Sequence, residues 1–194
     1  MTRRKIAGLS LFVVLLMAPA FSFAQTNTAL FGETKVQLSN DFVSALGSLS
    51  VAPGTVFPTR LQRGIVNFPV VGGAIDLQTA KGEILHSGGL TLTAANGTKV
   101  QLQAFTIDTT GQPVITGLVS VNGQVLGRLP LFTLQLPGNL SLPLKPVHNW
   151  ITLKGVGVQL STQAATALNT VFNVTAFQAG FNIGTANVSF YSFR

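Results

Sequence analysis

The sequence predicts a mainly β domain, an antiparallel β-sandwich or a partly open barrel with two short flanking α-helices. Three observations predict this class. Short apolar segments with strand-like alternation recur along the chain, and turns rich in glycine, asparagine and proline separate them. Two stretches show helical spacing of apolar residues, and a serine precedes each. Of 194 residues, 46% are hydrophobic and 9% charged, which predicts one well-buried core.

The first 24 residues predict a secretory signal peptide. Residues 2–5 form a basic start, an apolar stretch follows, and Ser22 and Ala24 occupy the small-residue positions of a cleavage site. We therefore expect an exported protein, whether secreted, periplasmic or held at the cell surface. Residues 25–33 are expected to form a loose leader and residues 34–194 a single domain. No later segment reaches the length of a transmembrane span.

The two helical stretches are Asn40–Leu49 and Thr162–Phe172. Ser39 and Ser161 are the expected N-caps, because a serine hydroxyl can accept from the free amides of a first turn. A Val-Gln-Leu-Ser string ends at each of these serines, at an offset of 122 residues. The repeat has two interpretations: a pseudo-symmetric domain with two helices flanking one site, or the general likeness of any two strand–cap–helix units.

The expected strands share alternating polar and apolar residues and are bounded by turn signals. They cover Thr34–Leu38, Gly64–Val71, Gly82–His86, Leu90–Ala94, Thr98–Ile107, Val114–Val121, Gln124–Arg128, Leu131–Leu136, Trp150–Leu160 and Ala186–Phe193. Pro53-Gly54 is interpreted as the end of the first strand–helix unit. The proline-rich stretch 136–147 is expected to be an edge or a loop.

One hairpin can be argued in register. A two-residue Asn-Gly loop would place Leu92 opposite the polar Gln101, whereas a three-residue loop over 95–97 places Leu92 opposite Val100. The longer loop is therefore predicted, because it puts the apolar side chains of both strands on one face. The alternation changes phase further along the second strand, which predicts a bulge near Ala104.

The supply of reactive side chains is thin and argues against an enzyme. Beyond the signal peptide the chain has five Asp and Glu, two His and no Cys. Without cysteine there is no disulfide and no thiolate metal site. No pair of carboxylates stands out for acid–base chemistry, and no phosphate-binding glycine pattern occurs. The nine remaining Lys and Arg are scattered, so we expect no nucleic-acid partner.

Both histidines have an ordinary and a functional interpretation. His86 stands beside Ser87, but neighbouring residues of a strand point to opposite faces, so a nucleophile–base pair is not expected and a strand end is. His148 lies two residues before Trp150 and could stack with it on a planar ligand. The ordinary interpretation is a loop histidine next to a half-buried aromatic residue.

Three stretches carry a resemblance to a known family. Residues 36–42 form an opening strand and helix start, and residues 68–102 form glycine-bounded strands and turns. Residues 155–165 follow a closing pattern of glycine, valine, leucine and paired alanines. In this order the features of 34–190 resemble the HtaA domain of exported bacterial haem-acquisition proteins. The resemblance implies a β-sandwich with two short helices that binds a ligand and does not catalyse a reaction.

The residues that the family uses for haem are absent from the matching positions. The resemblance places a haem-ligating tyrosine near Ala45 and a supporting histidine in the turn 94–97, and neither side chain is there. Haem iron takes His, Tyr, Met or Cys as its axial ligand, which leaves His86, His148 and Tyr191 as candidates. No cofactor is therefore firm, although haem is possible.

These observations lead to one expectation with two alternatives. We expect an exported, non-enzymatic binding or surface module of HtaA-like fold, whose partner is an unidentified hydrophobic small molecule or another surface component. The first alternative is a haem-binding protein of iron acquisition with a relocated axial ligand. The second is a structural surface or matrix protein.

Overall fold

The computed structural model describes residues 26–193, so the predicted signal peptide over 1–24 lies outside the described residues. Eleven strands and two helices make up this part of the chain. Their bounds are β1 Thr26–Leu38, α1 Asn40–Ser48, β2 Val51–Val56, β3 Arg60–Gln62, β4 Ile65–Asp76, β5 Lys81–His86, β6 Gly89–Ala94, β7 Lys99–Asp108, β8 Val114–Val121, β9 Gln124–Gln135, β10 Trp150–Leu160, α2 Thr162–Phe172 and β11 Asn182–Phe193.

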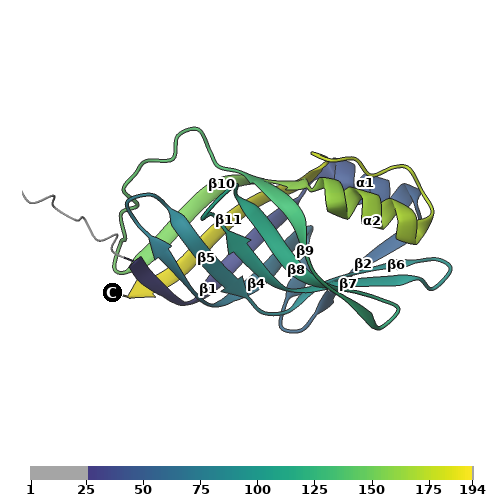
Figure 1. The fold of residues 1–194 in the computed structure, drawn as a ribbon, viewed down its shortest axis with the longest axis horizontal. Helices are drawn as coiled ribbons and strands as arrows, with labels where there is room; N and C mark the ends of the chain where they lie inside the picture. The colour runs from purple at the N-terminus through teal and green to yellow at the C-terminus, as the bar shows by residue number, and fades with distance from the viewer. Residues whose placement is uncertain (1–25, 194) are drawn as a thin grey trace, which may run out of the picture.

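The strands form a closed antiparallel barrel with a sheet extension (Figure 1). The barrel runs β7-β5-β4-β1-β11-β10-β9-β8, and pairing of β8 with β7 closes it. The predicted mainly β class with two short helices is confirmed. The expected sandwich is wrong, and the barrel, expected as the other possibility to be partly open, is closed. Alternation along a strand reports one buried face and does not distinguish a sheet packed on a second sheet from a sheet closed on itself.

Strand β7 belongs to both parts of the sheet. Its first half pairs with β6, which in turn pairs with the edge strand β2, and its second half pairs with β5. Between the halves the register shifts and Ala104 has a φ of 52°, so the predicted bulge is confirmed. Arg128 on β9 donates from Nη1 to the Ala104 carbonyl oxygen at 2.9 Å. The bend turns the first half of β7 out of the barrel and toward the helices.

The predicted hairpin between β6 and β7 is also confirmed. Leu92 pairs with Val100 across a three-residue loop, and both side chains are buried. Gly97 has a φ of 86°, the left-handed conformation that this loop requires and that glycine adopts without strain.

Two expectations about the N-terminal half are wrong. The leader predicted to be loose is strand from Thr26 onward, where it pairs with both β4 and β11 and buries Ala29. Pro53-Gly54, interpreted as the end of the first strand–helix unit, lies inside β2. Proline has no backbone N–H to donate to a neighbouring strand. Pro53 is tolerated in β2 because β2 lies at the edge of the sheet and pairs with β6 on one side, so no strand on its other side needs that hydrogen bond.

The two helices begin at the predicted serines and share one anchoring arrangement. The Ser161 hydroxyl accepts from Ala164 N at 3.0 Å and donates to the Pro130 carbonyl at 2.7 Å. The Ser39 hydroxyl likewise accepts from Phe42 N and donates to the Asn182 carbonyl. Each cap therefore starts a helix and also ties it to a neighbouring strand.

Replacing Ser161 by alanine is expected to lower the free energy of unfolding by about 1–2 kcal/mol. The first turn of α2 loses its capping oxygen, and the part-buried Pro130 carbonyl loses a donor. Ser48→Ala is the matched control, since that hydroxyl bonds to a carbonyl of its own helix and is exposed. Urea denaturation of both variants measures the difference. Equal stabilities would mean that the Pro130 carbonyl finds another donor.

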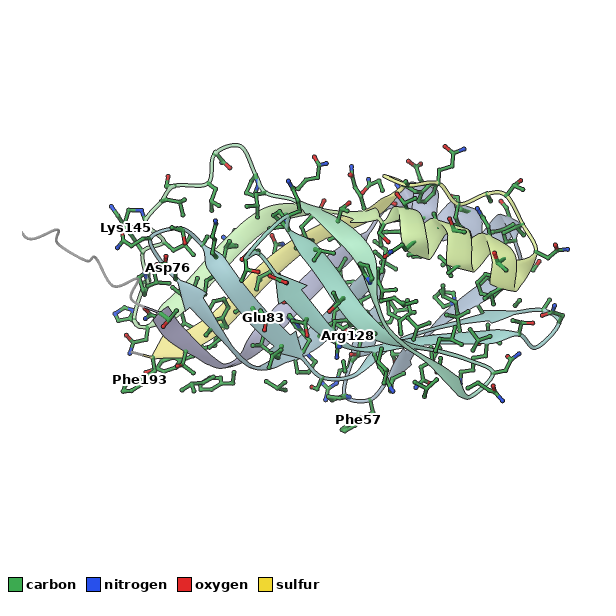
Figure 2. All side chains as sticks on the ribbon, viewed as in Figure 1. Phe57, Asp76, Glu83, Arg128, Lys145 and Phe193 are labelled. Atoms are coloured by element: carbon green, nitrogen blue, oxygen red, sulfur yellow. The ribbon has the colours of Figure 1, made fainter. Side chains whose placement is uncertain are left out.

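Buried apolar side chains line the inside of the barrel. Inward-facing apolar residues come from every barrel strand, and Phe190 and Ile151 on adjacent strands are among the most deeply buried. The charged side chains Glu83, Arg128 and Lys145 are exposed and lie on the outside (Figure 2). The barrel interior is therefore an apolar compartment, and these charged side chains lie outside it.

Candidate functional site

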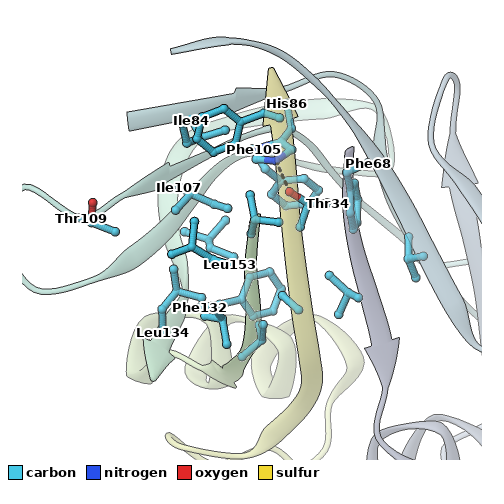
Figure 3. A pocket seen from close by; sticks show the side chains of 18 of the residues that line it. Thr34, Phe68, Ile84, His86, Phe105, Ile107, Thr109, Phe132, Leu134 and Leu153 are labelled. Atoms are coloured by element: carbon cyan, nitrogen blue, oxygen red, sulfur yellow. Dashed lines mark hydrogen bonds between the residues drawn. The ribbon is translucent and has the colours of Figure 1, made fainter. Parts of the chain in front are cut away.

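A cavity of about 90 Å³ lies in the barrel and is here called the barrel cavity (Figure 3). Apolar side chains from β1, β4, β5 and β7 to β11 line it, including Phe68, Phe105 and Phe132. Polar side chains enter the lining at three positions, Thr34, His86 and Thr109. The Thr109 hydroxyl is already bonded, since it donates to the Ala80 carbonyl at 2.7 Å.

Among residues 26–193, His86 is the one titratable group that lines this cavity. Its side chain is 5% exposed, and Nε2 lies 2.7 Å from the Thr34 hydroxyl oxygen. Nδ1 is buried without a hydrogen-bond partner. The expected strand end beside a glycine turn correctly describes the position of His86 on β5. The placement of its ring in the lining of the barrel cavity was not predicted.

Burial lowers the pKa of His86 to about 4. The dominant cause is desolvation of the charged imidazolium among apolar side chains. The polar backbone at Phe105 and Ile84 acts in the opposite direction, although neither residue meets hydrogen-bond geometry at Nδ1. His86 is therefore neutral near pH 7 and can act as a hydrogen-bonding group, but not as a cation.

A second void lies between the helices and the sheet extension. We call it the helix-side groove; its volume is about 60 Å³. Phe42 of α1, Ala164, Ala167 and Leu168 of α2, and residues of strands β6 to β11 line it, and all of the lining side chains are apolar. Leu126 on β9 belongs to the lining and is exposed, so the groove reaches the surface beside that strand. Both helices lie side by side at the end of the molecule where β2, β6 and the first half of β7 extend from the barrel (Figure 1).

The other two predicted ligand residues lie elsewhere, on the outside of the barrel. Tyr191 stacks on Phe31 with ring centroids 5.3 Å apart, and Trp150 meets both rings edge-on. Asn149 donates to the Tyr191 hydroxyl at 2.9 Å, and its neighbour His148 is exposed. Phe31, Trp150 and Tyr191 form an aromatic cluster on three adjacent strands.

The structure therefore does not bring the three candidate haem ligands together. His86 is inside the barrel, whereas His148 and Tyr191 are at its outer surface. None of them lines the helix-side groove. Within residues 26–193, no group of three or more acidic, histidine or cysteine side chains could hold a metal ion. No helix in this part of the chain is long and apolar enough to cross a membrane.

Sequence reasoning missed Thr34 as a site residue. The signal was available in principle, because Thr34 alternates in phase with Val36 and Leu38 and so points to the same face of β1. A polar residue on a buried face needs a partner. Its partner is 52 positions away, and the pairing of β1 with β4 and of β4 with β5 brings the two residues together.

Comparison with known proteins identifies the fold. No protein-family model and no curated protein sequence matches the chain. The structure matches the C-terminal domain of HtaA from Corynebacterium glutamicum with a TM-score of 0.66, 15% identity, and coverage of 86% of this chain and 99% of that domain. The N-terminal domain of HtaA matches with a TM-score of 0.64 and 10% identity over 84% and 97%.

A third solved structure is the haem-binding protein HtaB from Corynebacterium glutamicum. It matches with a TM-score of 0.59 and 10% identity, over 87% of this chain and 96% of that protein. The HtaA-like fold implied by the sequence resemblance is confirmed. At these identities the similarity concerns the fold, so function has to be argued from the chain's own residues.

Proposed function

We propose that this protein is an exported, non-enzymatic module that binds an apolar ligand in the helix-side groove. The observation that carries the proposal is the lining of the groove, which is apolar on both the helix and the sheet sides. Such walls stabilise an apolar ligand by roughly 25 cal/mol per Å² of surface removed from water. They offer no acid, base or nucleophile, so binding without turnover is the chemistry they support.

A tetrapyrrole is one class of ligand that the comparisons support, because HtaB is a haem-binding protein. In the part of the chain that the structure describes, no side chain that coordinates haem iron lines the groove. Affinity would come from contact with the flat apolar face of the ring and not from the metal. The void of about 60 Å³ is also small beside the ~300–1,000 Å³ of typical ligand pockets, so a large ligand would move the helices away from the sheet.

Titration with haem and with iron-free protoporphyrin IX tests this proposal. We expect the two dissociation constants to agree within about threefold, because no iron ligand distinguishes them. Absorbance follows haem and fluorescence follows the iron-free ring. An apolar fluorescent dye is titrated in parallel to detect binding of smaller ligands.

Ala167→Trp is expected to weaken binding of both porphyrins about tenfold or more, since Ala167 lines the groove and is half-buried. Thr166→Trp on the exposed side of the same helix is the control and is expected to bind normally. If neither porphyrin nor the dye binds saturably, or if both tryptophan variants bind equally well, the proposal is wrong.

A second candidate is haem binding through a relocated axial ligand at the aromatic cluster. The placement of an exposed His148 and of Tyr191 beside Trp150 favours it. His86 is a poor candidate, because a 90 Å³ interior cannot admit a haem. In this case haem would bind far more tightly than the iron-free ring, and its Soret band would be lost in His148→Ala or Tyr191→Ala.

A further inference from the structure

The barrel cavity and the helix-side groove share part of their lining. Leu90 of β6, Phe132 of β9 and Ile183 of β11 line both voids. All three side chains are apolar, and Phe132 is 9% exposed. The two voids therefore adjoin each other at these three residues, which we call the shared wall.

The shared wall lies at the end of the barrel where α2 begins. Phe132 pairs with Leu160, the residue before the Ser161 cap of α2. In Figure 3, Phe132 lies toward the helix, and His86 lies at the opposite end of the lining. Ile115 on β8 pairs with Phe132 and lines the barrel cavity but not the groove. A group that passed the shared wall from the groove would therefore meet Ile115 next.

The barrel cavity beyond the wall favours hydrocarbon over water or a polar group. The Thr34 hydroxyl and Nε2 of His86 bond to each other at 2.7 Å, and Nδ1 of His86 is buried. The Thr109 hydroxyl donates to the Ala80 carbonyl and accepts from Gly82 N. A buried water typically forms about three hydrogen bonds, which this lining does not offer.

We propose that the ligand of the helix-side groove carries a short alkyl group, which extends past the shared wall into the barrel cavity. The inference rests on the proposed function and names the class of ligand. The chain enters when side chains of the shared wall change rotamer, which leaves the strand pairing of the barrel intact.

The size and charge of the two voids define the alkyl group. A cavity of ~150 Å³ holds the six carbons of benzene, so about 90 Å³ holds about four carbons. Among residues 26–193, no charged side chain lines either void. A chain that ends in a carboxylate or an ammonium group would lie there without a counter-charge and is not expected to bind.

Naphthalene and 1-butylnaphthalene test the alkyl group. Both contain the same flat, apolar and fluorescent ring system, and the second carries a butyl chain. Burying one methylene group strengthens binding about fourfold, so we expect butylnaphthalene to bind at least about twentyfold more tightly than naphthalene. Fluorescence titration measures both dissociation constants.

Two variants of β11 locate the source of this gain. Ala186 is 2% exposed and lines the barrel cavity but not the groove, and Ala186→Leu fills most of the space for the chain. We expect this variant to bind naphthalene normally and to reduce the gain from the butyl group to about threefold or less. Thr185→Leu, at the exposed neighbouring position, is the matched control and is expected to keep the full gain.

A second measurement uses the wild-type protein, because an added side chain in a packed core can disturb folding. Ile115 lines the barrel cavity alone, and Leu168 of α2 lines the groove alone. With butylnaphthalene bound, we expect nuclear Overhauser effects from the terminal methyl group of the chain to the methyl groups of Ile115. Effects from the ring protons to Leu168 are expected in the same spectrum.

The proposal is overturned if the butyl group strengthens binding to the wild-type protein by no more than about threefold. It is also overturned if a folded Ala186→Leu keeps the full gain, or if the chain methyl group shows no effect at Ile115. Failure of the groove itself gives a different result. Naphthalene would then not bind, or would bind Ala167→Trp as tightly as wild type, and both proposals would be wrong.

Discussion

Phe190→Ala is expected to lower the free energy of unfolding by about 3–5 kcal/mol, the range for removing a buried aromatic ring from a core. Phe190 is 0% exposed on β11, pairs with Ile151 of β10, and lines the barrel cavity. The surrounding barrel is closed by hydrogen bonds on both sides of every strand, so it cannot collapse around the new void. Urea denaturation measures the loss.

Phe193→Ala on the same strand is the matched control. Phe193 is 60% exposed, so removing its ring leaves no cavity, and a change of at most about 0.5 kcal/mol is expected. If Phe190→Ala cost no more than the control, the barrel interior would not be packed as the structure describes.

The stability of the protein is expected to fall by about 3 kcal/mol between pH 7 and pH 4 because of His86 alone. The folded-state pKa is lowered to about 4, against about 6.5 in an unfolded chain. Between these values the unfolded state binds a proton that the folded state does not. The stability that depends on neutral His86 is therefore fully present above pH 6.5, and it is lost as the pH falls through the folded-state pKa.

Chemical denaturation at several pH values measures this slope, and two variants locate its source. In His86→Leu the free energy of unfolding is expected not to change with pH above pH 4.5. In His148→Leu, which removes an exposed imidazole, it is expected to keep the pH dependence of the wild-type protein. Hydrogen bonds lower the pKa values of Asp76 and Asp108, so these carboxylates contribute their own loss at lower pH. A slope that survives in His86→Leu would contradict the assignment.

The features that the sequence predicted correctly are local ones. Both helix starts depend on a serine and the three residues after it, and the hairpin over 95–97 depends on a glycine and the alternation beside it. The helix bounds Thr162–Phe172 and the strand bounds Val114–Val121 and Trp150–Leu160 match the structure. Short-range chemistry determines all of these elements.

The features that sequence reasoning missed depend on pairing between distant strands. Closure requires β7 to pair with β8 and β1 to pair with β11, and no local pattern records which strand is the neighbour. Strand β2 was missed because Pro53 is a strand breaker unless the strand lies at an edge. The barrel cavity was missed for the same reason as closure, since His86 becomes an interior residue when the barrel forms around it.

The pairing of β1 with β11 also has a consequence for how the chain folds. These strands are the first and the last of the described chain, and each has its partner some 150 residues away, as in the pair Lys35–Asn187. Such contacts cannot form until nearly the whole chain is present. Bringing the two strands together also costs the entropy of closing a long loop, so we expect this pairing to form late in folding. Folding is expected in milliseconds to seconds, as for other domains rich in distant contacts. During that interval the inward apolar faces are exposed to water and open to contact with other chains.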